Sequence, residues 1–236
     1  MRKNKSPLTI SQALKVYTGS GFTISVIFIT IYECLFFLGS IAGLTLMVSL
    51  TEKMSYTDAI TDIATTPAID IVMPFMPALI NCLVILGRTD RNAPGGKFFR
   101  TLKGGIGTFV KSRIGIYICL MISLLLFSGF VLTLEAVGII KTQNGILTAA
   151  AMFLSVILSL GAGTFALLIG KDFVRGIMAV ILCIALPIAA DAILLMSVQL
   201  GAAPAAFTAA GIIGAALLAA SFRIYLSYHE KHLWNA

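Results

Sequence analysis

Six apolar stretches joined by short polar connections constrain this fold more than any other feature of the sequence. They run over residues 22–50, 71–86, 114–134, 146–169, 176–200 and 205–228. A helix needs about 20 predominantly apolar residues to cross a bilayer. The mean hydropathy is +1.00 and only 11% of the residues are charged, whereas soluble proteins are about 25% charged. We therefore predict an all-α polytopic membrane protein, with residues 1–236 as a single transmembrane domain of six spans.

The second stretch is the shortest of the six. It contains Pro74, Pro77 and Asn81. Proline removes a backbone donor and bends a helix, so we expect a kink near the outer end of this span. The amide of Asn81 is a candidate for the polar lining of a substrate path or proton site.

A strongly basic segment, Arg88–Arg113, separates the second stretch from the third. It holds seven Lys or Arg residues against one acid, Asp90. Lys and Arg near span ends resist translocation, so a segment of this kind marks the cytoplasmic side of a membrane protein.

The middle of that basic segment is predicted to form a short cytoplasmic helix between two glycine pairs. Its candidate docking residues are Lys97, Phe98, Phe99, Arg100, Leu102 and Lys103. In two turns of helix the apolar members fall on one side and the basic members on another. We expect this surface to be one on which another protein pushes.

The basic residues also predict the topology. With six crossings, fifteen of the seventeen Lys and Arg residues fall on one side and only Lys53 and Lys141 on the other. Cytoplasmic loops carry the excess of Lys and Arg, so both termini are predicted to be cytoplasmic, in the cell (plasma) membrane. The net charge of +7 is then span-flanking charge, because it lacks the interleaved aromatic residues of a nucleic-acid surface.

Two short helices are predicted outside the spans. Residues 6–17 suit an interfacial elbow helix, with Ser6 as its cap and Pro7 at its first position. The acidic residues 51–70 suit an external helix, because Ser55 three residues before Asp58 resembles a capping box. We expect apolar side chains of that second helix, Ile60 and Ile63, to pack onto the bundle.

Two carboxylates lie inside predicted spans, Glu33 in the first and Asp191 near the middle of the fifth. A charged, unpaired carboxylate is costly in hydrocarbon, so such residues usually face a cavity or a partner. One interpretation is a polar lining for a substrate path, or a proton-binding pair. The other is a structural acid, satisfied for Glu33 by neighbours such as Tyr32 and Thr30 or by a backbone carbonyl.

Small residues recur where helices could approach closely. Gly39 and Gly43 form a small-xxx-small pair in the first span, and Gly161 and Gly163 lie in the fourth. The sixth span is rich in alanine and glycine. Such residues permit tight packing, either inside this bundle or across a dimer.

The sequence lacks the motifs of enzyme chemistry. Gly96-Lys97 is not part of a GxxxxGK[ST] phosphate-binding loop, and His229 and His232 lack the HExxH spacing of zinc proteases. The four cysteines lie in different apolar stretches without metal-ligand spacing. We predict no enzyme activity, no metal and no cofactor bound by this chain.

The elbow segment at residues 6–17, six spans with both ends inside, and a short helix in the inner loop between spans 2 and 3 resemble the membrane subunit of an ABC exporter of the type-2 permease class. This resemblance covers nearly the whole chain and rests on architecture. It implies a separate ATP-binding subunit that holds ATP and Mg, and a second permease subunit in a homo- or heterodimer.

By that resemblance, residues 97–103 would be the coupling helix resting on the ATPase. Spans 1, 2 and 5 would lie nearest the translocation path, which would carry a peptide, lipid or drug-like substrate outward. The family often has a re-entrant segment between spans 5 and 6, and here only Gly201–Pro204 and the start of span 6 could supply it.

Two other functions remain open from the residues alone. One is a secondary carrier coupled to protons through Glu33 and Asp191. The other is a membrane scaffold or immunity-type protein that transports nothing, which the small-residue packing would suit equally well.

Overall fold

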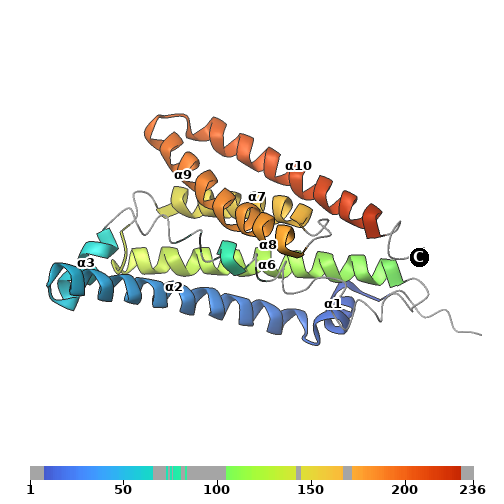
Figure 1. Cartoon of the computed structure of the whole chain (residues 1–236), viewed down its shortest axis with the longest axis horizontal. Helices are drawn as coiled ribbons and strands as arrows, with labels where there is room; N and C mark the ends of the chain where they lie inside the picture. Colours follow the sequence, from blue (N-terminus) through green and yellow to red (C-terminus); the bar gives the residue numbers. More distant parts are fainter. Residues whose placement is uncertain are drawn as a thin grey trace, which may run out of the picture.

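The computed structural model describes residues 8–65, 73, 75, 77–80, 83, 105–141, 145–166 and 172–229, and every regular element within them is helical. Long helices form an elongated bundle, with α3 at one end and α1 at the other (Figure 1). We call these the α3 end and the α1 end. In chain order the elements are α1 (Ile10–Thr18), α2 (Phe22–Glu52), α3 (Tyr56–Thr65), α6 (Gly105–Ala136), α7 (Gly145–Ala166), α8 (Asp172–Val180), η1 (Ile181–Ala185), α9 (Leu186–Gln199) and α10 (Ala203–His229).

Five helices of the described residues are long and apolar enough to cross a membrane. They are Phe22–Glu52, Gly107–Ala136, Gly145–Ala166, Gly176–Gln199 and Ala203–Ile224. Five of the six predicted spans thus coincide with long apolar helices, as expected of a helical membrane protein. Most of the remaining predicted span, residues 71–86, lies outside the described residues. Those of its residues that are described are helical.

Helix α6 begins earlier than the sequence suggested. The third span was expected from about residue 114, whereas the helix already begins at Gly105. Lys111 and Arg113, which we assigned to a basic loop, therefore lie within a helix, and that assignment was wrong. With 32 residues, α6 is about 48 Å long at ~1.5 Å per residue.

Helix α1 is shorter than the predicted elbow and begins later. Its cap is Thr9, not Ser6: the Thr9 side chain accepts a hydrogen bond from the backbone N–H of Gln12, and the Gln12 side chain accepts one from the backbone N–H of Thr9. The helix ends at Thr18 and is capped by Gly19, whose φ of 77° is left-handed and therefore favours glycine.

Helix α1 packs against the first turns of α6. Leu14 is fully buried there, and a Cβ on Gly115 would lie 3.3 Å from both Ile10 and Leu14. The ammonium of Lys111 donates to the backbone carbonyl of Leu8 at 2.7 Å. These contacts attach α1 to α6, while a position in the lipid headgroup layer remains a prediction.

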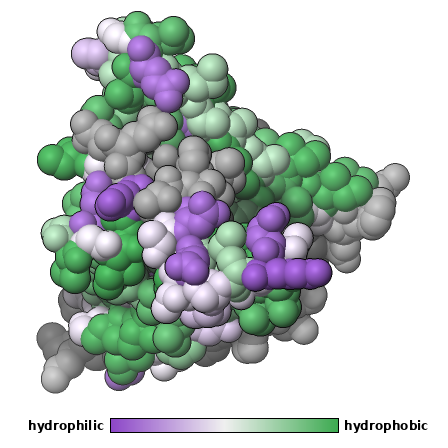
Figure 2. Space-filling model, turned by 90° about the vertical axis from the view of Figure 1, so that its left-hand side faces the viewer, coloured by the Kyte–Doolittle hydropathy of each residue, from purple (hydrophilic) through white to green (hydrophobic). Residues whose placement is uncertain are grey.

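Helix α3 agrees with the external helix predicted for the acidic segment. Ser55 precedes it and accepts a hydrogen bond from the backbone N–H of Asp58, and its hydroxyl donates to the Asp58 carboxylate at 2.6 Å. Ile63 is buried, and Ile60 is half-buried. At this α3 end, exposed hydrophilic side chains gather among apolar ones (Figure 2).

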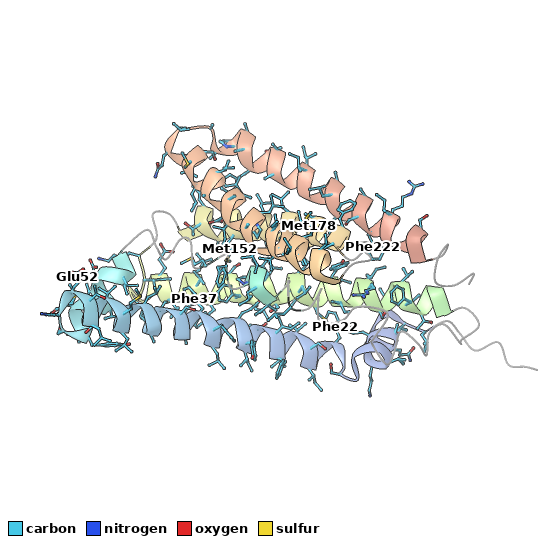
Figure 3. The ribbon with its side chains drawn as sticks, viewed as in Figure 1. Phe22, Phe37, Glu52, Met152, Met178 and Phe222 are labelled. Carbon is cyan, nitrogen blue, oxygen red and sulfur yellow. The ribbon has the colours of Figure 1, made fainter. Side chains whose placement is uncertain are left out.

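Two apolar clusters fill the bundle interior along its length. The cluster nearer the α3 end joins α2, α3, α6 and α7, and includes Phe37, Phe127 and Met152. The cluster nearer the α1 end joins α1, α2, α6 and α7, and includes Leu14 and Leu120. Figure 3 shows Phe37 and Met152 directed into the space between the helices.

Only some of the predicted small-residue contacts form. A Cβ on Gly161 would lie 2.8 Å from the backbone N of Leu218, so α7 and α10 pack at a distance that only glycine allows here. On α2, by contrast, a Cβ on Gly39 or Gly43 meets nothing within 4 Å among the described residues. The close approach predicted at Gly39 and Gly43 is therefore absent from the described part of the chain.

Candidate functional site

Glu33 lies on the face of α2 that packs against α6, and its side chain is 2% exposed. The Ser123 hydroxyl on α6 donates to its carboxylate at 2.5 Å. Thr30 extends this network, because its hydroxyl lies 3.1 Å from the Ser123 oxygen. The carboxylate is thus satisfied across a helix interface.

The same-helix neighbours proposed from sequence contribute less than expected. Tyr32 is 44% exposed, and its ring stacks obliquely on Phe28 and Phe36 along the outer side of α2. Thr30 reaches Glu33 only through Ser123. Ser123 was missed because it lies ninety positions away, and nothing in its local sequence distinguishes it from other serines in α6.

The Glu33 network is enclosed by apolar packing on both sides along the bundle. Toward the α3 end, the Phe37 and Phe127 rings meet edge to face at 5.6 Å. Toward the α1 end lie Val26 and Leu120 of the other cluster. A carboxylate in such surroundings loses its hydration, so the Ser123 hydrogen bond is a principal compensation.

Asp191 lies on α9 and is also 2% exposed. Helix α9 packs mainly on α7, whereas α2 packs on α6 and α3. The two carboxylates therefore occupy different helix interfaces. This arrangement does not favour the proton-binding pair that the sequence left open.

The helix that carries Asp191 is interrupted between one and two turns earlier. Residues Ile181–Ala185 form a π-helical segment, and the Leu186 N–H bonds to the Ile181 carbonyl five residues back. Pro187 follows, and its ring would clash with a carbonyl four residues earlier in a regular helix. Single-turn π segments are frequent at functional sites. The sequence analysis did not predict it.

Buried hydroxyl side chains occur on both α7 and α9. Thr148, Ser155 and Ser159 of α7 and Ser197 of α9 are all buried. Sequence reasoning found only the carboxylate, because serine and threonine are unremarkable in an apolar helix until their orientation is known.

Arg113 is a further residue that the sequence misplaced. It is 4% exposed in α6, and its guanidinium lies 5.5 Å from the centre of the Phe109 ring. One turn further along α6, the Tyr117 hydroxyl is 2.6 Å from Thr164 of α7, and its ring meets Phe222 of α10 edge to face. The α1 end is thus joined across three helices by polar and aromatic contacts.

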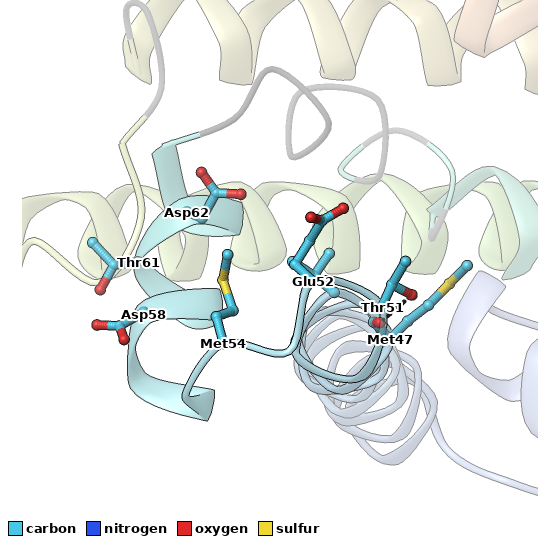
Figure 4. A pocket seen from close by; sticks show the side chains of 8 residues that line it. Met47, Thr51, Glu52, Met54, Asp58, Thr61 and Asp62 are labelled. Atoms are coloured by element: carbon cyan, nitrogen blue, oxygen red, sulfur yellow. Dashed lines mark hydrogen bonds between the residues drawn. The ribbon is translucent and has the colours of Figure 1, made fainter.

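An open cavity of about 870 Å³ lies between the end of α2 and α3. Its lining residues are Met47, Val48, Thr51, Glu52, Met54, Asp58, Thr61 and Asp62. Figure 4 shows Glu52 and Asp62 on one side, with Asp58 and Thr61 directed away from them. The acidic lining was visible in the sequence as part of residues 51–70, but the cavity was not.

The remaining predicted site residues fall outside the described part of the chain. These are Asn81 and the docking residues Lys97, Phe98, Phe99, Arg100, Leu102 and Lys103. Their roles stay predictions.

Among the described residues, no group of three or more His, Cys, Asp or Glu side chains is placed to hold a metal ion. Comparison with known proteins finds no matching family model, no matching curated protein and no matching solved structure.

Proposed function

We propose that this chain is the membrane subunit of an ATP-driven exporter of the type-2 ABC permease class. ATP and Mg would be bound by a separate soluble subunit, and a second permease subunit would complete the path for a peptide, lipid or drug-like substrate. Both termini would be cytoplasmic, in the plasma membrane. The charge asymmetry and the five apolar helices support this assignment.

The observation that supports the proposal is that α6 contains the end of the basic segment, residues 105–113. Residues 97–103 end two positions before α6 begins at Gly105. The helix then passes without interruption through the bundle and contacts α1, α2 and α7. A force applied to the basic segment would therefore enter a helix that touches most of the core.

Helix α1 would stabilise the start of α6, the end that follows the docking residues. It is attached there by the Lys111 hydrogen bond to Leu8 and by the packing of Leu14 on Gly115. A helix held at its first turns moves with its neighbours and does not bend alone, because packed interiors transmit displacement. Nucleotide binding to the partner would then shift the population between inward- and outward-facing states of the bundle.

The proposal is tested by asking whether an ATPase binds this chain through the docking residues. The chain, purified in mild detergent from cells that express it naturally, should retain a soluble ATP-binding protein. Phe98→Asp combined with Leu102→Asp should reduce that retention at least tenfold, because two charged side chains would replace an apolar contact.

A matched control carries the same change at the other end of the bundle. Tyr56→Asp combined with Val137→Asp alters two exposed side chains, 46% and 70% accessible, and should leave the ATPase bound. If the docking variant inserts normally and still retains the ATPase, or if no ATPase is found with the unaltered chain, the proposal is wrong.

A further inference from the structure

The Glu33 carboxylate is one end of a line of hydrogen bonds that crosses from α2 to α6 and back. The Ser123 hydroxyl donates to it at 2.5 Å, and the Thr30 hydroxyl lies 3.1 Å from the Ser123 oxygen. Thr30 also lies 2.9 Å from the backbone carbonyl of Val26, one turn back on α2. We call Glu33, Ser123, Thr30 and the Val26 carbonyl the Glu33 relay.

The contacts of the Glu33 relay satisfy both protonation states of the carboxyl group. When Glu33 is ionised, Thr30 donates to Ser123 and Ser123 donates to Glu33. When Glu33 is protonated, both bonds can reverse, because a hydroxyl group can either donate or accept. The Thr30 proton then turns to the Val26 carbonyl, 2.9 Å away. Neither state leaves a hydroxyl proton of the relay without an acceptor.

Other buried hydroxyl groups of these two helices are arranged differently. Thr45 of α2 donates to the Ile41 carbonyl, and Ser128 of α6 donates to the Leu124 carbonyl, both at 2.8 Å. These bonds cannot reverse, because a carbonyl has no proton to donate. Reversal requires a hydroxyl group that bonds a second hydroxyl or a carboxyl group, as Ser123 does.

Burial decreases along the Glu33 relay toward Thr30. Ser123 is fully buried and Glu33 is 2% exposed, whereas the Thr30 side chain is half-buried. The edge-to-face pair of Phe37 and Phe127 covers the side of Glu33 toward the α3 end. Thr30 is therefore the end of the relay at which a proton can enter.

We propose that Glu33 is a reversible proton-binding site that is loaded through Thr30 and Ser123. A hydronium ion gives a proton to the Thr30 oxygen and becomes water. The Thr30 proton passes to the Ser123 oxygen, and the Ser123 proton passes to the Glu33 carboxylate. Each hydroxyl group again holds one proton, and the carboxyl group is neutral. Release follows the same steps in reverse, with water as the acceptor.

The charged groups around α2 lie near the ends of the bundle. Helix α2 packs on α1, α3 and α6. Besides Glu33, the ionisable residues of these four helices are Lys15, Tyr17, Tyr32, Cys34, Glu52, Tyr56, Asp58, Asp62, Lys111, Arg113, Tyr117, Cys119 and Glu135. Cys34 and Cys119 are within about one turn of Glu33 or Ser123 in sequence, and Arg113 is about 15 Å before Ser123 along α6.

The predicted second span adds no charge, because residues 71–86 contain no Asp, Glu, Lys, Arg or His. A response to pH that disappears with Glu33 can therefore be assigned to the Glu33 relay. The inference does not depend on the proposed ATPase partner.

The first test follows the infrared band of a protonated carboxyl group while the purified chain is titrated over a range of pH. The unaltered chain should show a band that is lost as the pH rises. Glu33→Gln should lack this band, and Asp191→Asn should keep it. The proposal is overturned if no band titrates, or if the band survives in Glu33→Gln.

An isotope label keeps this test decisive even if Glu33→Gln fails to fold. Carbon-13 in the glutamate carboxyl groups of the unaltered chain should shift the band, because a heavier carbon slows the C=O stretch. A titrating band that does not shift would belong to an aspartate and would overturn the proposal.

The second test measures how fast the band appears after a rapid drop in pH. Thr30→Val should slow its appearance at least tenfold, because the variant lacks the hydroxyl group through which the proton enters. Thr45→Val is the matched control on the same helix, since the hydroxyl that it removes bonds the Ile41 carbonyl, and it should leave the rate unchanged. Equal rates in the two variants would show that no proton passes through Thr30.

Discussion

Helices α2 and α7 are both long, apolar and interrupted by small and polar residues, yet the bundle uses them differently. In the most apolar part of α7, 56% of the residues are buried, against 22% in the most apolar part of α2. On α7 the hydroxyls and Gly161 all face other helices. On α2 the polar contacts lie on one face, while Gly39 and Gly43 lie on the exposed one.

This comparison shows that residue type and spacing do not identify a contact. Gly39 and Gly43 have the four-residue spacing expected of a packed pair. Gly161 has no small residue four positions before or after it. Only Gly161 meets a neighbouring backbone. The same holds for serine: Ser123 satisfies a carboxylate on another helix, whereas Ser159, among the described residues, bonds a carbonyl of its own helix.

The largest effect in this comparison is expected at the glycines. Gly161→Leu should destabilise the bundle by about 3 kcal/mol or more, because its Cβ would lie 2.8 Å from the Leu218 backbone N, and overpacking costs ~1–3 kcal/mol even where side chains can adjust. Gly43→Leu should change stability by less than about 0.5 kcal/mol. Unfolding in detergent measures both, and equal losses would mean that α7 and α2 are packed alike.

An intermediate effect is expected at two fully buried serines. Ser123→Ala should cost about 1–3 kcal/mol, since Glu33 would lose its hydroxyl donor in an apolar interface. Ser159→Ala should cost no more than about 0.5 kcal/mol, because the carbonyl it bonds belongs to its own helix. Combining Ser123→Ala with Glu33→Gln should be less than additive, and full additivity would show that the two side chains do not interact.

The smallest loss of stability is expected when one of two aromatic rings of α2 is replaced. Phe37→Leu should cost about 1 kcal/mol, because it removes the edge-to-face contact with Phe127. Phe28→Leu alters a ring that is 66% exposed and should be nearly neutral in the purified chain. A larger loss at Phe28 than at Phe37 would indicate that the outer face of α2 carries a contact absent from the isolated chain.

Much of the local structure was predictable because its causes are local. The apolar stretches gave helices close to their expected ends, and Ser55 with Asp58 identified the start of α3. The start of α6 was missed because Lys111 and Arg113 suggested a loop, although Lys111 reaches the Leu8 carbonyl and Arg113 lies beside Phe109. Charged side chains are compatible with a helix in an apolar bundle when their charged groups contact a carbonyl or an aromatic ring.

The sequence by itself determined that this chain forms long apolar helices with charged connections, because hydrophobic length, caps and charge act over a few residues. Only the tertiary structure decided which face of each helix is covered. That choice gave Glu33 its partner on α6, buried Asp191 on α9, and left Gly39 and Gly43 exposed. Such outcomes depend on contacts between residues far apart in the chain, which no local pattern specifies.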